Sequence, residues 1–95
     1  MVNEIKISWS LNAVNSLEEI FNFYKHKSER GALKVINDIY NSPSLIRFPK
    51  QFQMDELNPK YRRIIVRDYK VLYREEKNNI VIVDVVCTLM KSKNK

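Results

Sequence analysis

The amino-acid sequence predicts an α+β fold with the element order β-α-α-β-β-β. In this fold a helical hairpin packs on one face of a twisted, mostly antiparallel four-stranded sheet. Residues 4–9 alternate between apolar and polar, residues 11–42 repeat apolar side chains at helical steps of three and four, and residues 61–89 are dominated by β-branched and aromatic side chains. The chain has 95 residues and no linker-like stretch, so residues 1–95 are expected to form a single domain.

The first strand is expected over residues 4–9. Ile5, Ile7 and Trp9 face one way and polar side chains face the other, which is typical of a half-buried strand. Trp9 is therefore expected in the core. Ser10 follows directly and is a suitable N-cap for the helix that comes next.

Two amphipathic helices follow, from Leu11 to Lys27 and from about Glu29 to Ser42, with Ser28 as the N-cap of the second. So short a link between them predicts an αα-hairpin. Pro43 then ends the second helix or begins a further short turn, because proline suits a first helical position. The apolar faces of the hairpin need a sheet to cover, and the remaining strands supply it.

Residues 43–60 form the least regular segment, which contains all three prolines. Five apolar side chains are expected to hold this segment against the rest of the protein: Leu45, Phe48, Phe52, Met54 and Leu57.

Three strands, at roughly 61–67, 69–76 and 79–89, are expected to form an antiparallel meander. The breaks fall at Arg67-Asp68 and at Lys77-Asn78-Asn79, where the Asn-Asn pair tolerates the positive φ of a tight hairpin. The last strand is apolar on both faces, as is typical of a central strand that is covered on both sides.

Strict alternation divides the meander side chains between two faces. In the first meander strand, Arg62, Ile64 and Val66 lie on one face, and Tyr61, Arg63, Ile65 and Arg67 lie on the other. In the last strand, Val81, Val83, Val85 and Cys87 share a face opposite Ile80, Ile82, Asp84, Val86 and Thr88. Tyr73 and Cys87 are expected in the core, and Asp84 is expected either to meet an arginine across the sheet, which we favour, or to belong to a site.

Cations surround the predicted sheet of this chain, whose formal net charge is +6. They are Lys60, Arg62, Arg63, Arg67, Lys70, Arg74 and Lys77, and Tyr61, Tyr69 and Tyr73 alternate with them. The functional interpretation, which we favour, is a patch for phosphate or an acidic partner, because the planar arginine fork pairs with either group. The alternative is a solvated sheet face whose charge is balanced by Asp68, Glu75 and Glu76.

Several classes of function are not expected from this sequence. With a lone His26 and a lone Cys87, neither a metal site nor a disulfide framework is expected, and no cofactor is expected. The single cysteine fits a reducing cytoplasm. The N-terminus has no signal-peptide pattern, and no apolar stretch approaches the length of a membrane span.

The chain also resembles a known family. The phrases YRRIIV, DYKVLYR and IVIVDVV, preceded by LIRFP and set in this element order, are similar to the RelE/ParE superfamily of bacterial toxins, most of all to its ParE-like branch. The resemblance implies the toxin of a type II toxin–antitoxin system, neutralised by a cognate antitoxin. In that superfamily, ParE-like members poison DNA gyrase, whereas RelE-like members cut mRNA in the ribosomal A site.

Two basic residues match positions that the RelE-like ribonucleases use. Arg62 matches a basic position in the first meander strand, and Lys70 matches the basic residue after the tyrosine of the second. Ile64 and Leu89 stand where cations are common in the superfamily, and no tyrosine follows Leu89 in this sequence. The leading hypothesis is therefore a ParE-like toxin that acts by binding, with DNA gyrase as the implied target.

Two alternatives stay open. One is a RelE-like ribonuclease that uses Arg62 and Lys70 on ribosome-bound mRNA, and the other is a degenerate member that only binds its antitoxin. A homodimer or a toxin–antitoxin hetero-oligomer is compatible with either. The residues expected to bind the target or nucleic acid are Lys60, Arg62, Arg63, Arg67, Lys70, Arg74 and Lys91.

Overall fold

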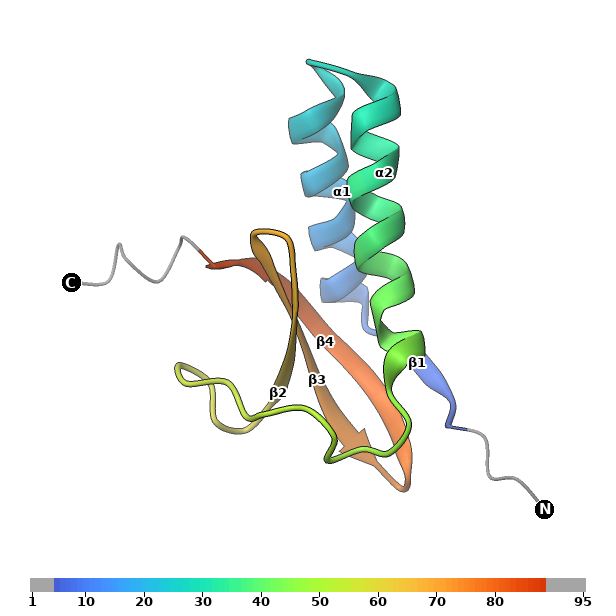
Figure 1. The fold of residues 1–95 in the computed structure, drawn as a ribbon, viewed down its shortest axis with the longest axis vertical. Helices are drawn as coiled ribbons and strands as arrows, with labels where there is room; N and C mark the ends of the chain where they lie inside the picture. Colours follow the sequence, from blue (N-terminus) through green and yellow to red (C-terminus); the bar gives the residue numbers. More distant parts are fainter. Residues whose placement is uncertain (1–4, 89–95) are drawn as a thin grey trace.

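The computed structural model describes residues 5–88 and confirms the predicted order of elements (Figure 1). Strand β1 (Ile7–Trp9) leads into helices α1 (Leu11–Lys25) and α2 (Glu29–Asn41), followed by the short 3-10 helix η1 (Ser42–Leu45). Strands β2 (Arg62–Val66), β3 (Tyr69–Glu76) and β4 (Asn79–Cys87) complete the fold. The further short turn at Pro43 is thus a 3-10 helix that begins directly where α2 ends.

The four strands form one sheet in the order β1-β4-β3-β2. The β2–β3 and β3–β4 pairs are antiparallel, and β1 pairs with β4 in parallel. The sheet is therefore mixed but mostly antiparallel, and β4 is a central strand, as its apolar sequence predicted. Strand β1 is shorter than expected and pairs only with Ile80–Ile82.

Both helices begin at the predicted serines. The Ser10 hydroxyl accepts a hydrogen bond from the Ala13 amide at 3.1 Å, and the Ser28 hydroxyl accepts one from the Gly31 amide at 3.0 Å. Each bond satisfies an amide that the first helical turn would otherwise leave unpaired. The helical hairpin covers one face of the sheet, where Tyr73, Val71 and Ile39 are fully buried.

A β-bulge in β4 corrects the predicted division of its side chains. Leu72 pairs with Asp84 and the next residue, Tyr73, pairs with Ile82, so Val83 is the extra residue. The alternation therefore shifts by one position at Val83. Ile80, Ile82 and Val85 all belong to the buried core, although strict alternation placed Val85 on the other face. Cys87 is only partly buried, but it packs against the same core.

The two hairpin turns fall where they were expected, with one difference in register. Arg67 has a φ of 54° in the turn between β2 and β3. In the next turn the positive φ values belong to Lys77 at 53° and Asn78 at 70°, and Asn79 already pairs with Glu76. Two consecutive residues with positive φ are typical of the tight turn that matches strand twist.

Residues 46–61 are held by polar contacts and by two apolar side chains, and the expected apolar attachment was wrong for four of its five residues. Leu45, Phe48, Met54 and Leu57 are exposed, whereas Phe52 packs on the core, edge-on to Tyr73. Ile46, at the start of the segment, is buried in the same core. The Tyr73 hydroxyl donates to the Pro49 carbonyl at 2.9 Å. Met54 forms an isolated antiparallel bridge with Arg62, which extends the sheet by one residue pair.

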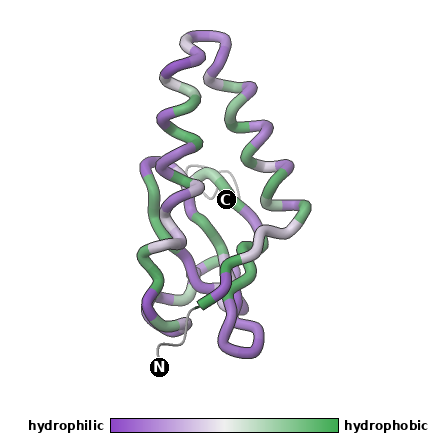
Figure 2. Tube along the Cα trace, turned by 90° about the vertical axis from the view of Figure 1, so that its right-hand side faces the viewer, coloured by the Kyte–Doolittle hydropathy of each residue, from purple (hydrophilic) through white to green (hydrophobic). Residues whose placement is uncertain are grey.

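The hairpin of α1 and α2 extends well past the sheet (Figures 1 and 2). In both views the half of the hairpin near the α1–α2 turn stands clear of the strands, and Figure 2 shows that this tip is hydrophilic. Within residues 5–88, neither helix is long and apolar enough to cross a membrane.

Candidate functional site

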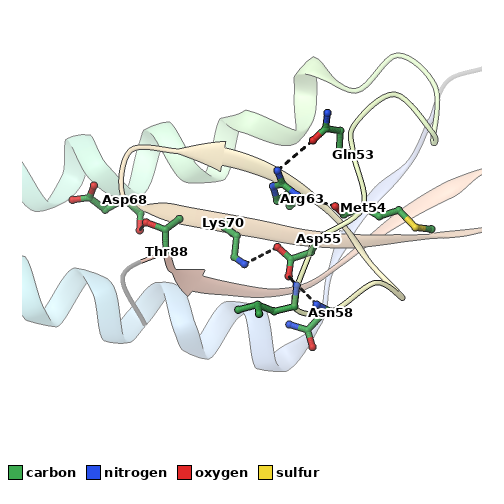
Figure 3. A network of polar contacts seen from close by, with 9 residues as sticks. Gln53, Met54, Asp55, Asn58, Arg63, Asp68, Lys70 and Thr88 are labelled. Carbon is green, nitrogen blue, oxygen red and sulfur yellow. Dashed lines mark hydrogen bonds and ion pairs between the residues drawn. The ribbon is translucent and has the colours of Figure 1, made fainter. Parts of the chain in front are cut away.

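The sheet has an open face, opposite the helices, and a buried ion pair lies on it (Figure 3). The Lys70 ammonium nitrogen lies 2.6 Å from Oδ1 of Asp55, and the two side chains are only 8% and 1% exposed. Lys70 comes from the central strand β3, whereas Asp55 comes from the irregular segment that precedes β2. The pair therefore joins this segment to the sheet.

Backbone amides complete the environment of Asp55. Its Oδ2 accepts hydrogen bonds from the amides of Leu57 at 3.1 Å and Asn58 at 2.9 Å. Burial by itself would raise the pKa of Asp55, but the hydrogen bond from Lys70 and those from the two amides outweigh burial and lower it. Asp55 is thus held as a carboxylate, and the charge of Lys70 is balanced inside the protein.

Arg62 and Lys70, the two residues that match ribonuclease positions, lie on opposite faces of the sheet. Arg62 pairs with Tyr73 in the β2–β3 register and shares the helix-covered face, whereas Lys70 pairs with Ile65 on the open face. The structure therefore does not bring Arg62 and Lys70 together around one phosphate.

Both arginines at the start of β2 bind the preceding segment. Arg62 donates through Nη1 to the Phe52 carbonyl at 2.8 Å, and Arg63 donates through Nη1 to the Met54 carbonyl at 2.7 Å. Arg63 Nη2 also reaches Oε1 of Gln53 at 3.3 Å, as Figure 3 shows. These contacts hold residues 52–54 beside the sheet.

The remaining predicted cations are dispersed. Arg67 pairs with Asp38 of α2 at 2.8 Å, and Arg74 pairs with Glu76 on its own strand at 3.4 Å. Lys60 is exposed in the turn before β2, and Lys91 and Leu89 lie outside the described residues. The predicted cations of the described chain therefore do not form one continuous patch.

Exposed side chains lie beside the Lys70–Asp55 pair. Ile65, the register partner of Lys70, is 54% exposed, and it lines a hollow at the pair together with Arg63 and Glu56. Leu57, two residues after Asp55, is 51% exposed. Met54 is 50% exposed but bridges to Arg62 and therefore lies on the opposite face. We call the surface of Leu57, Arg63 and Ile65 around the pair the open-face surface, and apolar groups beside an arginine are typical of protein contact surfaces.

Sequence reasoning missed Asp55. A signal was present, because Lys70 lies within a strand of apolar residues, and a lysine buried there requires an acidic partner. Asp84 does not meet an arginine as favoured. Its Oδ1 instead accepts hydrogen bonds from the Ser16 hydroxyl at 2.6 Å and from the Val85 amide at 2.8 Å. This occurs because α1, and not a basic strand, lies beside β4 at that point.

No cluster of three or more histidine, cysteine or acidic side chains that could hold a metal ion occurs in the part of the chain that the structure describes. Two tyrosines of the core, Tyr69 and Tyr73, have raised pKa values. Burial and a hydrogen bond to Tyr24 raise the pKa of Tyr69, and burial raises the pKa of Tyr73.

The fold defines a small α+β protein with two helices packed against a four-stranded mixed sheet. The family model described as "ParE toxin of type II toxin-antitoxin system, parDE" matches residues 7–91. The chain therefore belongs to the ParE toxin family, within the RelE/ParE superfamily that its motifs resemble.

A solved structure shares the fold. The chromosomal ParDE toxin–antitoxin system from P. aeruginosa has a chain that superimposes with a TM-score of 0.75 at 17% identity, covering 87% of this chain and 95% of that chain. A YoeB/ParE toxin from Agrobacterium tumefaciens gives a TM-score of 0.45 at 15% identity, with 87% and 98% of the two chains covered. Among curated proteins, none matches this chain in sequence.

Proposed function

We propose that this chain is a ParE toxin that acts by binding DNA gyrase and is neutralised by a cognate antitoxin. Membership of the ParE family supports the toxin assignment. One observation favours binding over catalysis. The charge of Lys70 is already balanced by the buried carboxylate of Asp55, 2.6 Å away.

The ribonuclease alternative needs basic groups that converge on a scissile phosphate. Preorganised charges of this kind contribute much of the rate of such enzymes. Arg62 and Lys70 lie on opposite faces of the sheet, and the Arg62 guanidinium already donates to a backbone carbonyl. Both observations count against this alternative and favour a toxin that binds.

The open-face surface is the part of the molecule that we assign to the target. Its exposed Leu57 and Ile65 supply apolar contact area, and Arg63, with Lys60 in the neighbouring turn, supplies charge. Interfaces that combine an apolar centre with arginine are typical of specific protein contacts.

The test in cells is induction of the protein with growth and RNA 5′ ends followed together. We expect growth arrest without new 5′ ends inside translated frames. New ends phased to codons would establish a ribonuclease and contradict the proposal. Unimpaired growth of cells that contain folded protein would identify a member that only binds its antitoxin.

Two surface variants make this test specific. Ile65→Asp should relieve the growth arrest, because it places a carboxylate in the centre of the open-face surface. Leu11→Asp changes a different exposed apolar residue, which lies at the start of α1, and should remain toxic. Equal toxicity of both variants would remove the open-face surface from the proposal.

A further inference from the structure

Positive charge is concentrated at the end of the helical hairpin that carries the α1–α2 turn. Residues 25–34 contain Lys25, Lys27, Arg30 and Lys34 against one acidic residue, Glu29, and all of these side chains are exposed. With His26 neutral, this stretch carries a net charge of +3, which is half of the +6 of the whole chain. Figures 1 and 2 show that this end of the hairpin stands clear of the sheet.

A hollow of about 360 Å³ gathers three of the cations of this region. It opens where the α1–α2 turn and the first turns of α2 meet the β2–β3 turn. Lys27, Lys34 and Arg67 line it, one from each of these places, and none of the described residues that line it is acidic. We call the hollow and these three residues the cationic hollow.

The three cations are available to an incoming anion. Lys27 and Lys34 are exposed, and the ion pairs found within residues 5–88 include neither of them. Arg67 pairs with Asp38, but both side chains are about half exposed, and an exposed ion pair of this kind is weak. An anion that enters the hollow can therefore compete for Arg67.

The hollow offers almost no apolar surface. Ala32 is fully buried and Val35 is only 6% exposed, so the groups that remain accessible beside the cations are polar or small. The Ser28 hydroxyl lies among them, and its oxygen already accepts a hydrogen bond from the Gly31 amide, which leaves its hydrogen free to donate. Lysine, arginine and hydroxyl groups without apolar contact area are typical of surfaces that contact phosphate.

We infer that the cationic hollow binds the phosphate backbone of double-stranded nucleic acid without reading its sequence. A duplex presents phosphates at high density along its axis, and each cation of the hollow can neutralise one of them. Single strands are usually held by stacked aromatic rings, but Tyr24, the one ring among the described lining residues, is half-buried and its hydroxyl pairs with that of Tyr69 at 3.4 Å. This inference goes beyond the proposed function, because it concerns the chain in the absence of gyrase and antitoxin.

The test measures binding of the full chain to a short fluorescein-labelled DNA duplex by fluorescence anisotropy at several salt concentrations. Neutralisation of three phosphates predicts that the logarithm of the affinity falls with the logarithm of the salt concentration at a slope of about −2.7. Binding should therefore weaken about fortyfold between about 50 and 200 mM salt. A duplex of unrelated sequence should bind equally well, and the amide signals of Lys27, Gly31 and Arg67 should shift in ¹⁵N-labelled protein.

Two double variants separate the cationic hollow from the overall charge of the protein. Lys27→Gln combined with Lys34→Gln should leave one phosphate contact and reduce the slope to about −0.9. Lys50→Gln combined with Lys77→Gln removes the same charge from two exposed lysines outside the hairpin and should keep the slope of the wild type. Equal slopes for the two double variants would overturn the inference.

A substitution inside the hollow tests the same point without removing a cation. A Cβ built on Gly31 would meet only the side chain of Ser28, at 3.4 Å, so a longer side chain at this position has room to enter the hollow. Gly31→Glu places a carboxylate among the cations and should weaken binding of the duplex more than its neutral match, Gly31→Gln. Equal binding of these two variants would contradict the assignment to the hollow.

Further results would decide the ligand. At least about tenfold tighter binding of a DNA or an RNA duplex would name that duplex as the source of the phosphates, and similar binding would assign the hollow to the backbone of either. The inference would be overturned by tighter binding of a single strand, or by a polyglutamate peptide that displaces the duplex at an equal or lower concentration of charge. No binding at low salt with protein at about 100 µM would also overturn it.

Discussion

Lys70 and Asp55 face each other across the boundary between the sheet and the irregular segment, with 2.6 Å between the ammonium nitrogen and Oδ1. Among the ion pairs of residues 5–88 it is the one that is almost fully buried. The same contact neutralises a lysine that the resemblance to RelE-like ribonucleases suggests for catalysis, and it fixes a segment that carries several exposed apolar side chains. Its consequences for stability, pH dependence and activity can each be measured.

Asp55→Asn should destabilise the protein by about 3 kcal/mol, because it leaves the Lys70 charge buried without a partner. Urea unfolding followed by circular dichroism measures the change. The matched control is Asp38→Asn, which removes the exposed partner of Arg67 and should cost less than about 1 kcal/mol. Similar losses in the two variants would contradict the structural role of the buried pair.

The stability of the wild type should fall in acid because of Asp55. The pKa of this group is lowered in the folded protein, so its contribution is complete above the ordinary aspartate pKa of about 3.9 and is lost as the pH falls through the lower folded value. The stability difference between wild type and Asp55→Asn should therefore narrow as the pH falls below about 4. Urea midpoints measured for both proteins from neutral to acid pH test this, and a constant difference would show that Asp55 does not titrate as described.

The double variant Asp55→Leu with Lys70→Met removes both buried charges together. Replacement of a buried ion pair by apolar side chains is often neutral or stabilising, so the double variant should fold and be more stable than Asp55→Asn. If Lys70 is structural, the variant should also arrest growth like the wild type when its gene is induced. A stably folded double variant without toxicity would show that Lys70 acts on the target.

The bulge in β4 predicts which valines and isoleucines of this strand contribute most to the stability of the core. Ile80→Ala should cost about 3 kcal/mol, because Ile80 is fully buried. Val81→Ala should lower the free energy of unfolding by less than about 1 kcal/mol, because Val81 is only partly buried on the other face. Thermal or urea unfolding compares the two variants, and a larger loss at Val81 would place the wrong face of β4 against the helices.

Periodicity and capping chemistry predicted most of the fold. The spacing of apolar residues located both helices, and Ser10 and Ser28 cap them as expected. The faces of β2 were also correct, because that strand is regular. The predicted alternation was wrong in the second half of β4, because the extra residue at Val83 moves every later side chain to the other face. The composition of the strand does not indicate this bulge.

The candidate site was predictable only in part. Sequence pattern identified Arg62 and Lys70 as basic residues of neighbouring strands, but not that they occupy opposite faces of the sheet. Asp55 was missed because its partner is distant in sequence and lies on a different element. The Arg67–Asp38 contact was missed for the same reason, since local spacing does not report pairs that the tertiary fold creates.

The most direct test of the central claim is inhibition of DNA supercoiling by purified gyrase in the presence of this protein. We expect the wild type to inhibit supercoiling, Ile65→Asp to inhibit at least about tenfold less well, and Leu11→Asp to inhibit like the wild type. No inhibition by folded protein at large molar excess would contradict the claim that this chain acts by binding gyrase.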